Sequence, residues 1–417
     1  MIRSILVGGA LLVLASCTGL SPTPVPSATP GQQPTGATAA PSNPPTLSGN
    51  LDMWHTFTAG DPAVSRGANA ALGAALDVVR NENPGLSLSV TEVSLGELFI
   101  TYQLQGASGT PDVVYAPNDN AGGIAAAGLS SDLSTAISPG ELSRFAPIAV
   151  DASKVNGQLV QMPATIRSVA FYYRTDRVTS FPATTDELVT AIRDNGLKLG
   201  LYQSIYQVFG LWGSFGGTLM DSSGRCVADS TGVAQAFAYY AALKAAGATW
   251  YGPNAYDQMA ADFRSGALDA VIDGPWAGDA YRDANPDTIA VAPLPAGPAG
   301  PAAPMVGVDG WTVNPHSANA ELAIAFAKRM TQPDILAILS GQAIQVPADP
   351  AVEPADPLSA GFAAAAQAGG VPRPQVPQMG AFWGHFTDAL NAVVDDGTDP
   401  EQAVAEACAT MNSDNGL

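Results

Sequence analysis

Tryptophans at the ends of expected strands are the residues whose positions most suggest a binding site. Trp276 follows an apolar stretch that ends at Ile272, and Trp383 closes a loop-like segment ahead of an expected helix. Ligands of open α/β sheets bind beyond the carboxyl ends of the strands. A Trp ring at such a place suits the apolar CH face of a pyranose, while Asp, Asn, Arg or Tyr side chains bond its hydroxyls. The alternative is that each Trp is a core or rim residue, and the pattern alone leaves both open.

Signatures of catalysis are largely missing. The sequence has no His-Glu-x-x-His motif, no Walker loop and no G-x-G-x-x-G, and its 3 His are far apart. Ser214 and Gly216 resemble part of a nucleophile elbow, but Trp212 stands where that turn requires glycine. The 37 Asp and Glu offer many pairs for glycoside hydrolysis, and nothing selects one. No enzyme, metal site or cofactor is therefore indicated.

Length and charge restrict the domain count and the partners. The 417 residues exceed the size of roughly 250–300 at which a single core stops growing, so two or three domains are expected. With 17 basic and 37 acidic residues, the formal net charge is -20. Because a phosphate backbone or an anionic lipid surface would be repelled, nucleic acid is excluded as a partner.

The first residues predict export and a lipid anchor. Residues 1–16 carry one basic residue, Arg3, and an apolar run that is too short to span a bilayer, which is typical of a signal peptide. The run ends in Leu14-Ala15-Ser16-Cys17, which resembles the bacterial lipobox, so we expect Cys17 to be lipidated. The expected location is the outer face of the bacterial cytoplasmic membrane. An ordinary signal peptide with a chance Cys is the alternative.

Residues 17–49 are expected to form a solvated tether. From Thr18 to Gly49 there is no charged residue, and Pro is interspersed with Ser, Thr, Gly and Ala. Such a segment buries too little apolar area to offset its ordering entropy. Beyond it remain Cys226 and Cys408, which in an oxidising compartment form either a disulfide or two buried free thiols.

Behind these candidates, the chain alternates expected strands and helices. Patterns typical of strands lie at 51–57, 86–91, 112–115, 168–174 and 270–272. Apolar residues at helical spacing occur at Leu72, Leu76 and Val79, at Val233, Phe237 and Tyr240 before Gly247, at Leu322, Phe326 and Met330, and at Phe386, Leu390 and Val394. Asp399, Pro400 and Gln402 suit the N-cap, N1 and N3 positions of a last helix. This alternation predicts α/β layers.

Several segments together resemble the maltose/maltodextrin-binding proteins, within the sugar-binding lipoproteins of ABC importers. The resemblance runs from about Leu51 to Met411 and rests on Gly274-Pro275-Trp276, on Pro377–Trp383, on Pro111–Tyr115 with Asp119 and Gly122-Gly123, on Asn156–Leu159 with Pro163, and on Val306-Gly307-Val308. The segments occur in the family's order and at comparable spacing. They are less specific for the sugar than for the family.

The resemblance implies a two-lobed periplasmic-binding-protein-like fold of type II, in which the lobes close on a ligand in the cleft between them. One lobe would combine 50–165 with 311–341 and the other 170–305 with 349–417. Hinge crossings are expected near 166–169, 306–310 and 342–348. Both Cys226 and Cys408 then fall in the second lobe, which favours their disulfide.

The resemblance also implies a set of ligand-binding residues. The family's stacking tryptophans match Trp276 and Trp383, its tyrosine matches Tyr206, its aspartate matches Asp119, and Asp309 lies in the second hinge crossing. At four positions the chain departs from the family: Ala116 replaces a Trp, Asn120 an Arg, Arg167 a hinge Glu and Ser204 a Glu. The expected ligand-binding set is Asp119, Asn120, Arg167, Ser204, Tyr206, Trp276, Asp309 and Trp383.

These residues imply an extracellular receptor that delivers a mono- or oligosaccharide to an ABC permease, acting as a monomer and not necessarily on maltose. Since the stacking residues are kept while part of the polar set is replaced, the kind of ligand is expected to be the same. Arg167 offers only donors, which suit ring or hydroxyl oxygens or an anionic substituent. A receptor of the same fold for a non-sugar solute and a surface-anchored glycoside hydrolase are the alternatives.

Overall fold

The structure is a computed structural model that describes residues 46–57 and 62–417. The predicted signal peptide 1–16, the predicted lipidation site Cys17 and most of the predicted tether 17–49 lie outside the described residues. The predicted boundary of the tether at residue 49 is wrong, because folded structure begins earlier in the chain. Leu47 is buried and its backbone N–H donates to Asn83 Oδ1 at 2.6 Å, and Gly49 already belongs to a strand.

The first sheet has the strand order β13-β6-β12-β3-β1-β2, with β14 pairing with β12 off this path. Its strands are β1 (Gly49–His55), β2 (Leu86–Glu92), β3 (Val113–Pro117), β6 (Met162–Arg167), β12 (Met305–Val313), β13 (Val346–Pro347) and β14 (Val371–Pro372). β1 is parallel to β2 and β3, while β12 runs antiparallel to β3 and β6. A small hairpin, β4 (Lys154–Val155) with β5 (Gln158–Leu159), lies apart.

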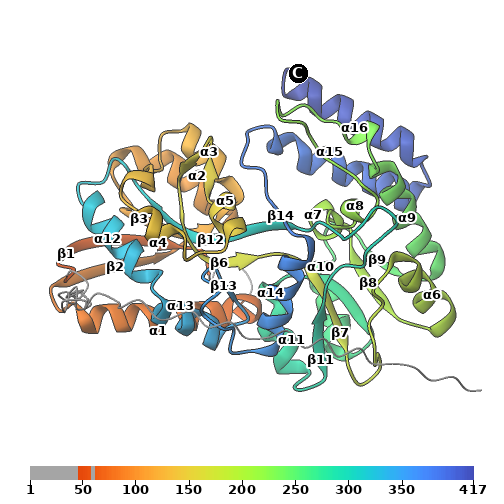
Figure 1. Cartoon of the computed structure of the whole chain (residues 1–417), viewed down its shortest axis with the longest axis horizontal. Coiled ribbons are helices and arrows are strands. Elements are labelled where there is room, and N and C mark those ends of the chain that lie inside the picture. The colour runs from red at the N-terminus through yellow and green to blue at the C-terminus, as the bar shows by residue number, and fades with distance from the viewer. Residues whose placement is uncertain (1–45, 58–61) are drawn as a thin grey trace, which may run out of the picture. The chain divides into compact units, whose positions relative to one another are not determined.

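Helices cover both faces of the first sheet (Figure 1). Met53 and Tyr115 point to the face on which α1 (Pro62–Glu82), α12 (Ala320–Met330) and α13 (Pro333–Gln342) pack. Trp54 and Val114, which neighbour Met53 and Tyr115 in their strands, point to the other face, toward α2 (Leu95–Gln105) and α3 (Ala121–Ala126). The short helices α4 (Pro139–Leu142) and α5 (Pro147–Ala152) follow α3. We call this sheet with its helices the first lobe.

The second sheet has the order β11-β7-β10-β8-β9. Its strands are β7 (Ala170–Arg174), β8 (Leu199–Tyr202), β9 (Thr249–Tyr251), β10 (Ala270–Asp273) and β11 (Ile289–Ala292). β8, β9 and β10 are parallel, and β7 is antiparallel to β10 and β11. Because strand residues alternate between faces, Phe171 and Ile272 belong to one apolar cluster, and Tyr172 and Val271 belong to another.

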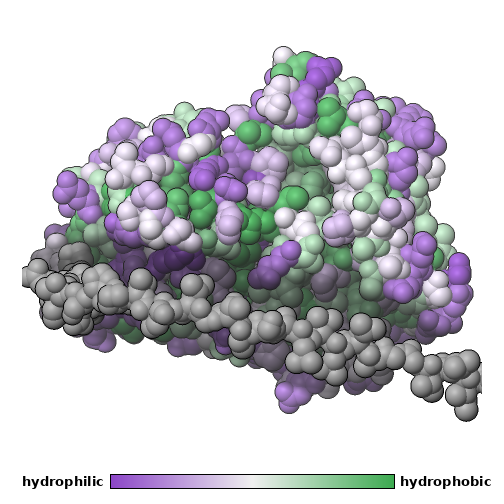
Figure 2. All heavy atoms as spheres, viewed as in Figure 1, coloured by the Kyte–Doolittle hydropathy of each residue, from purple (hydrophilic) through white to green (hydrophobic). Residues whose placement is uncertain are grey.

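The second sheet is also covered on both faces, and we call it with its helices the second lobe. The face of Phe171 carries α6 (Thr185–Asn195), α9 (Val233–Ala246), α15 (Met379–Asn391) and α16 (Pro400–Asp414). The face of Tyr172 carries α10 (Tyr256–Ser265), α11 (Gly278–Ala284) and α14 (Pro357–Gly369). The short α7 (Ile205–Val208) and α8 (Leu211–Ser214) follow β8. On the molecular face seen in Figure 2, hydrophobic and hydrophilic residues are interspersed.

The chain passes from one sheet to the other between β6 and β7, between β11 and β12, and after β13. The crossings expected at 166–169, 306–310 and 342–348 each overlap a strand of the first sheet. One segment differs from expectation: β14 falls within 349–417, which was expected in the second lobe, yet Val371 pairs with Met305 of β12. A single apolar cluster includes Val308 of the first sheet and Tyr172 of the second, so the lobes share packed side chains.

Local sequence signals agree with the element boundaries. α9 ends at Gly247, whose φ of 116° lies in the left-handed region that glycine adopts without strain. Asp399 caps α16 by accepting from the Gln402 backbone N–H at 3.1 Å, with Pro400 in the first turn. One expectation was wrong: Trp383 lies within α15, because that helix already begins at Met379.

Cys226 and Cys408 are joined by a disulfide that ties the loop after α8 to α16. Both residues are buried in the apolar cluster on the Phe171 face. Within residues 46–57 and 62–417, no helix combines the length and apolar character needed to cross a bilayer. The same residues contain no group of three or more His, Cys, Asp or Glu suited to hold a metal ion.

Candidate functional site

A cavity of about 530 Å³ lies between the two lobes and is lined by residues of both. That volume falls within the range of sites for small molecules. The first lobe contributes residues at or just after the ends of β1, β3 and β6 and one from the middle of β12, and the second contributes residues that follow β8 and β10 and one residue of α15. The polar and aromatic lining consists of Thr56, Phe57, Asp119, Thr165, Arg167, Tyr206, Trp276, Asp279, Asp309, Gln345, Arg373 and Trp383.

Three aromatic rings form one wall of the cavity. The centre of the Tyr206 ring lies 6.1 Å from that of Trp276 and 6.2 Å from that of Trp383. Each ring is partly exposed, so each offers a face to a ligand. The three residues stand on separate elements, α7, the turn after β10 and α15. The wall therefore exists only when the second lobe is folded.

A buried carboxylate, Asp273, holds Trp276 in place through the hydroxyl of Tyr256. Its indole Nε1 donates to the hydroxyl of Tyr256 at 3.0 Å, and that hydroxyl donates to Asp273 Oδ2 at 3.0 Å. Asp273 also accepts from Tyr281 at 2.7 Å and from the Gly274 backbone N–H at 2.8 Å. Burial raises the pKa of Asp273 to about 6, although these hydrogen bonds favour the charged form.

The turn that carries Trp276 requires glycine at residue 274. A β-carbon added to Gly274 would lie 2.0 Å from the Trp276 ring, which is far inside van der Waals contact. The Trp276 ring folds back over its own turn toward the cavity. Glycine in the Gly274-Pro275-Trp276 sequence is therefore explained by the space that the ring needs.

Arg167 of β6 links two walls of the cavity. Its Nη1 lies 3.1 Å from Oδ1 of Asp309, and its guanidinium carbon lies 4.9 Å from the centre of the Trp276 ring. Thr165 donates to the second oxygen of Asp309 at 3.2 Å. Burial raises the pKa of Asp309, and Arg167 opposes this rise. Burial works against the charge of Arg167, but Asp309 and then Asp119 raise its pKa.

Arg373 forms a second ion pair, with Asp119. Its guanidinium carbon lies 5.1 Å from the centre of the Tyr206 ring and 5.8 Å from that of Trp383. Burial alone would raise the pKa of Asp119, but the charges of Arg373 and Arg167 lower it. The third lining carboxylate, Asp279, lies 2.7 Å from Arg282. Every charged residue of the lining thus has a partner of opposite charge.

Three lining residues carry buried side-chain polar atoms that have no partner among the described residues. They are Thr56 Oγ1, Gln345 Oε1 and Arg373 Nε. Leaving a buried polar atom unpaired costs about 1–3 kcal/mol, so these side chains add polar groups of unmet hydrogen-bonding capacity to the residues around the cavity.

Six of the eight residues expected to bind a ligand line the cavity: Asp119, Arg167, Tyr206, Trp276, Asp309 and Trp383. Asn120 and Ser204 do not. The Asn120 side chain lies against Gly123, with Oδ1 only 2.4 Å from where a β-carbon would be, and Ser204 occupies the N-cap position of α7. Asn120 directly follows Asp119 and Ser204 lies two positions before Tyr206, but neither residue belongs to the lining.

Sequence reasoning missed Arg373, Thr165 and Gln345. Arg373 had a usable signal, because basic residues number only 17 in the chain and this one stands between Pro372 and Pro374. Thr165 and Gln345 gave none, since each lies in a short apolar stretch and becomes a lining residue only through the packing of β6 and β13.

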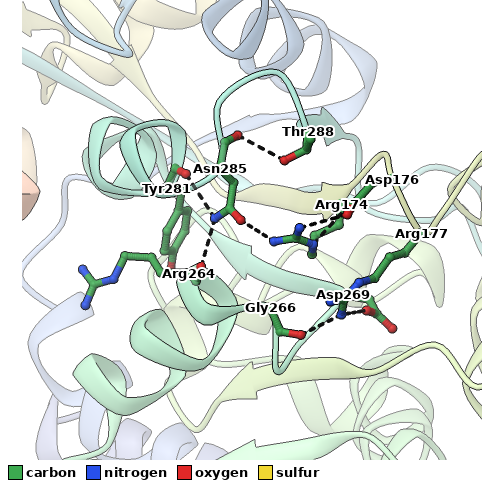
Figure 3. A network of polar contacts seen from close by, with 9 residues as sticks. All are labelled: Arg174, Asp176, Arg177, Arg264, Gly266, Asp269, Tyr281, Asn285 and Thr288. Atoms are coloured by element: carbon green, nitrogen blue, oxygen red, sulfur yellow. Dashed lines mark hydrogen bonds and ion pairs between the residues drawn. The ribbon is translucent and has the colours of Figure 1, made fainter.

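A second polar network lies at the opposite end of the second sheet (Figure 3). Arg177 Nη1 lies 2.8 Å from Oδ1 of Asp269, just before β10, and Arg174 donates to Asn285. Asp269 directly precedes β10, whereas Asp273 is the last residue of β10, at the end nearer the cavity. The residues of this network join β7, β10 and α11, and they do not line the cavity.

Comparisons with known proteins agree with this geometry. Residues 80–368 match the family model described as bacterial extracellular solute-binding protein. The maltotriose-binding protein of Pyrococcus abyssi is 27% identical over 318 residues, which cover 71% of this chain and 68% of that protein. The maltodextrin-binding protein MdxE of Bacillus subtilis is 25% identical over 261 residues, 57% of this chain and 61% of that protein.

A solved structure shares the whole architecture. The cyclo/maltodextrin-binding protein complexed with maltotetraose superposes with a TM-score of 0.72 and 25% identity, covering 88% of this chain and 97% of that one. The expected two-lobed fold of type II is thereby confirmed.

Proposed function

Because the chain belongs to the bacterial extracellular solute-binding proteins, we propose that it captures an uncharged mono- or oligosaccharide in the cavity between its lobes and delivers it to an ABC permease. The chain is a solute-binding protein and not an enzyme. The relatives compared above are named for binding maltotriose and maltodextrin, which supports a saccharide here.

The observation that carries the proposal is the wall of Tyr206, Trp276 and Trp383 in a cavity that polar side chains also line. Aromatic faces suit the CH surface of a sugar ring, and hydroxyl groups both donate and accept hydrogen bonds. A saccharide can therefore stack on the rings while its hydroxyls bond polar side chains of the lining.

The paired charges of the lining favour an uncharged ligand. Arg167 and Arg373 already have Asp309 and Asp119 as partners, and Asp279 has Arg282. An anionic ligand would add a buried charge without a free cation, which is costly. Of the groups that Arg167 suits, ring or hydroxyl oxygens are therefore favoured over an anionic substituent.

Capture would involve a hinge motion of the two lobes. Arg167 and Asp309 come from the first sheet and Trp276 from the second, so a ligand that contacts all three binds the closed state better than the open one. We further propose that lipid on Cys17 holds the protein at the membrane and that the protein acts as a monomer.

A thermal-shift screen tests the proposal. The protein lacking residues 1–17 would be tested with uncharged mono-, di- and oligosaccharides and with amino acids, phosphate and polyamines. A ligand at about 100 times its Kd adds roughly 2.7 kcal/mol of stability and raises Tm. The proposal fails if no saccharide raises Tm. A rise with a non-sugar solute alone would identify a receptor of the same fold for that solute.

A further inference from the structure

Arg373 is mounted rigidly between the two lobes. It stands between Pro372 and Pro374, and a residue before proline is restricted to extended backbone. Its backbone N–H donates to Val306 O of β12 at 2.9 Å, directly after the two-residue pairing of β14 with β12. The side chain therefore leaves a fixed point on the first sheet.

The guanidinium of Arg373 lies where the lobes meet. It pairs with Asp119, which follows β3 of the first lobe, and lies over the rings of Tyr206 and Trp383 of the second. Its side chain is only 7% exposed. Burying a guanidinium to this degree carries a large desolvation cost, which one carboxylate and two ring faces offset in part.

Most of the hydrogen-bond donors of the Arg373 side chain have no partner among the described residues. A guanidinium has five N–H groups. Among the described residues, the structure gives its side chain one hydrogen bond, from Nη1 to Asp119, and Nε is buried without a partner. Arg329 offers a contrast, since it is buried to a similar degree but makes four hydrogen bonds, to Glu82 and Asp334. Arg329 therefore uses its donors in structural ion pairs, whereas most donors of Arg373 have no partner among the described residues.

We propose that Arg373 is a saccharide-binding residue that donates to ligand oxygens while Asp119 accepts from the neighbouring hydroxyl. This inference rests on the proposed function of the cavity and adds a residue that the expected binding set lacks. The Arg373–Asp119 pair presents donors and acceptors side by side, which matches adjacent hydroxyls of a pyranose. The Arg373 guanidinium lies over the rings of Tyr206 and Trp383, so a sugar that packs against these rings beside it would bring its hydroxyls close to the pair.

Substitution of Arg373 in the full-length chain tests the inference. Arg373→Met removes the donors and keeps the length of the side chain, and Arg373→Lys keeps the charge for Asp119 but loses the planar fork. Affinity would be measured by titration calorimetry with maltotriose, cellobiose, lactose and raffinose. We expect Arg373→Met to weaken binding of the tightest of these saccharides by about ten- to a hundredfold, because hydrogen bonds from a charged group are lost. Arg373→Lys should weaken it by about fivefold or more.

Arg329→Met is the matched control, because it removes an equally buried, ion-paired arginine that does not line the cavity. We expect it to lower Tm and to leave the affinity within about twofold of the wild type. Thermal unfolding of every variant separates loss of affinity from loss of fold.

The outcomes are distinguishable. If the wild type binds none of the four saccharides and none stabilises it in the wider screen, the proposed function fails, and the role of Arg373 fails with it. If the wild type binds and Arg373→Met binds equally well, the inference alone is overturned. Should Arg373→Met not fold, Arg373→Lys decides, and an affinity within twofold of the wild type overturns the inference.

Discussion

The guanidinium carbon of Arg167 lies 4.9 Å from the centre of the Trp276 ring, although the two residues belong to different lobes. Arg167 ends β6 of the first sheet, and Trp276 lies in the turn after β10 of the second. The same arginine pairs with Asp309 at 3.1 Å. One side chain therefore connects the polar wall of the cavity to its aromatic wall, across the boundary at which the lobes would move.

Replacing the stacking residues should weaken saccharide binding without unfolding the protein. For Trp276→Ala and Trp383→Ala we expect a loss of about 2 kcal/mol or more, or roughly 30-fold in Kd, since buried aromatic anchors contribute most to binding. Titration calorimetry with the saccharide found in the screen measures this. Trp250→Ala is the control, because Trp250 packs on the same lobe but does not line the cavity. Unchanged affinity in both cavity variants would contradict the site assignment.

Removing Arg167 should destabilise the protein more than removing an exposed arginine. Arg167→Met leaves Asp309, whose side chain is 6% exposed, without its cation, and we expect a loss of about 2–4 kcal/mol in the free energy of unfolding. Arg177→Met breaks the pair with Asp269 seen in Figure 3, where the Arg side chain is 40% exposed, and should cost about 1 kcal/mol or less. Urea unfolding measures both. Equal losses would mean that the Arg167–Asp309 pair contributes no more than a surface pair.

Asp273 should make stability depend on pH. Burial raises its pKa from 3.8 to about 6, so the folded protein favours the neutral carboxyl. The stabilisation from this group is present below the unfolded pKa and is lost as pH rises through about 6, a total of about 3 kcal/mol.

Comparison with Asp273→Asn isolates this group, since the amide does not titrate. Between about pH 4 and pH 7, the free energy of unfolding of the wild type should fall relative to the variant by about 2.4 kcal/mol, most of that total. Trp fluorescence during urea unfolding is a suitable measurement, because Tyr256 connects Asp273 to Trp276. Parallel pH profiles would show that Asp273 keeps an ordinary pKa.

Reduction of the disulfide should destabilise the second lobe. Cys226 and Cys408 are 182 residues apart, and closing a loop of that length removes chain entropy worth about 5 kcal/mol from the unfolded state. We expect reductant to lower Tm of the wild type but not of the Cys226→Ser, Cys408→Ser double variant. A wild-type Tm that is insensitive to reductant under unfolding conditions would contradict a stabilising disulfide.

The repeating patterns of the sequence predicted the elements well. Leu86, Leu88 and Val90 alternate with polar residues because β2 is an edge strand that packs on the core with one face only, and the periodic residues before Gly247 form α9. Such patterns depend on neighbours in the chain. The extent of α15 was harder to predict, since Pro377 and Gly380 suggested a loop where the helix already begins at Met379.

The site was predicted in part, for a related reason. Trp276 and Trp383 stand out because tryptophan is rare and because each follows a recognisable segment. Asn120 and Ser204 were expected because they occupy family ligand-binding positions near Asp119 and Tyr206. Residues one or two apart on a turn or helix point in different directions, and these two do not belong to the cavity lining.

By itself, the sequence determined the alternation of strands and helices, the acidic charge, and the aromatic residues available for stacking, because each is a property of composition or of short-range spacing. Only the tertiary structure decided that Arg373 faces Asp119, 254 residues away, and that Arg167 lies on Trp276. The reason is physical: a buried charge takes whichever partner the packed lobes bring near it, and that partner depends on strand order and crossings, which no local pattern of residues specifies.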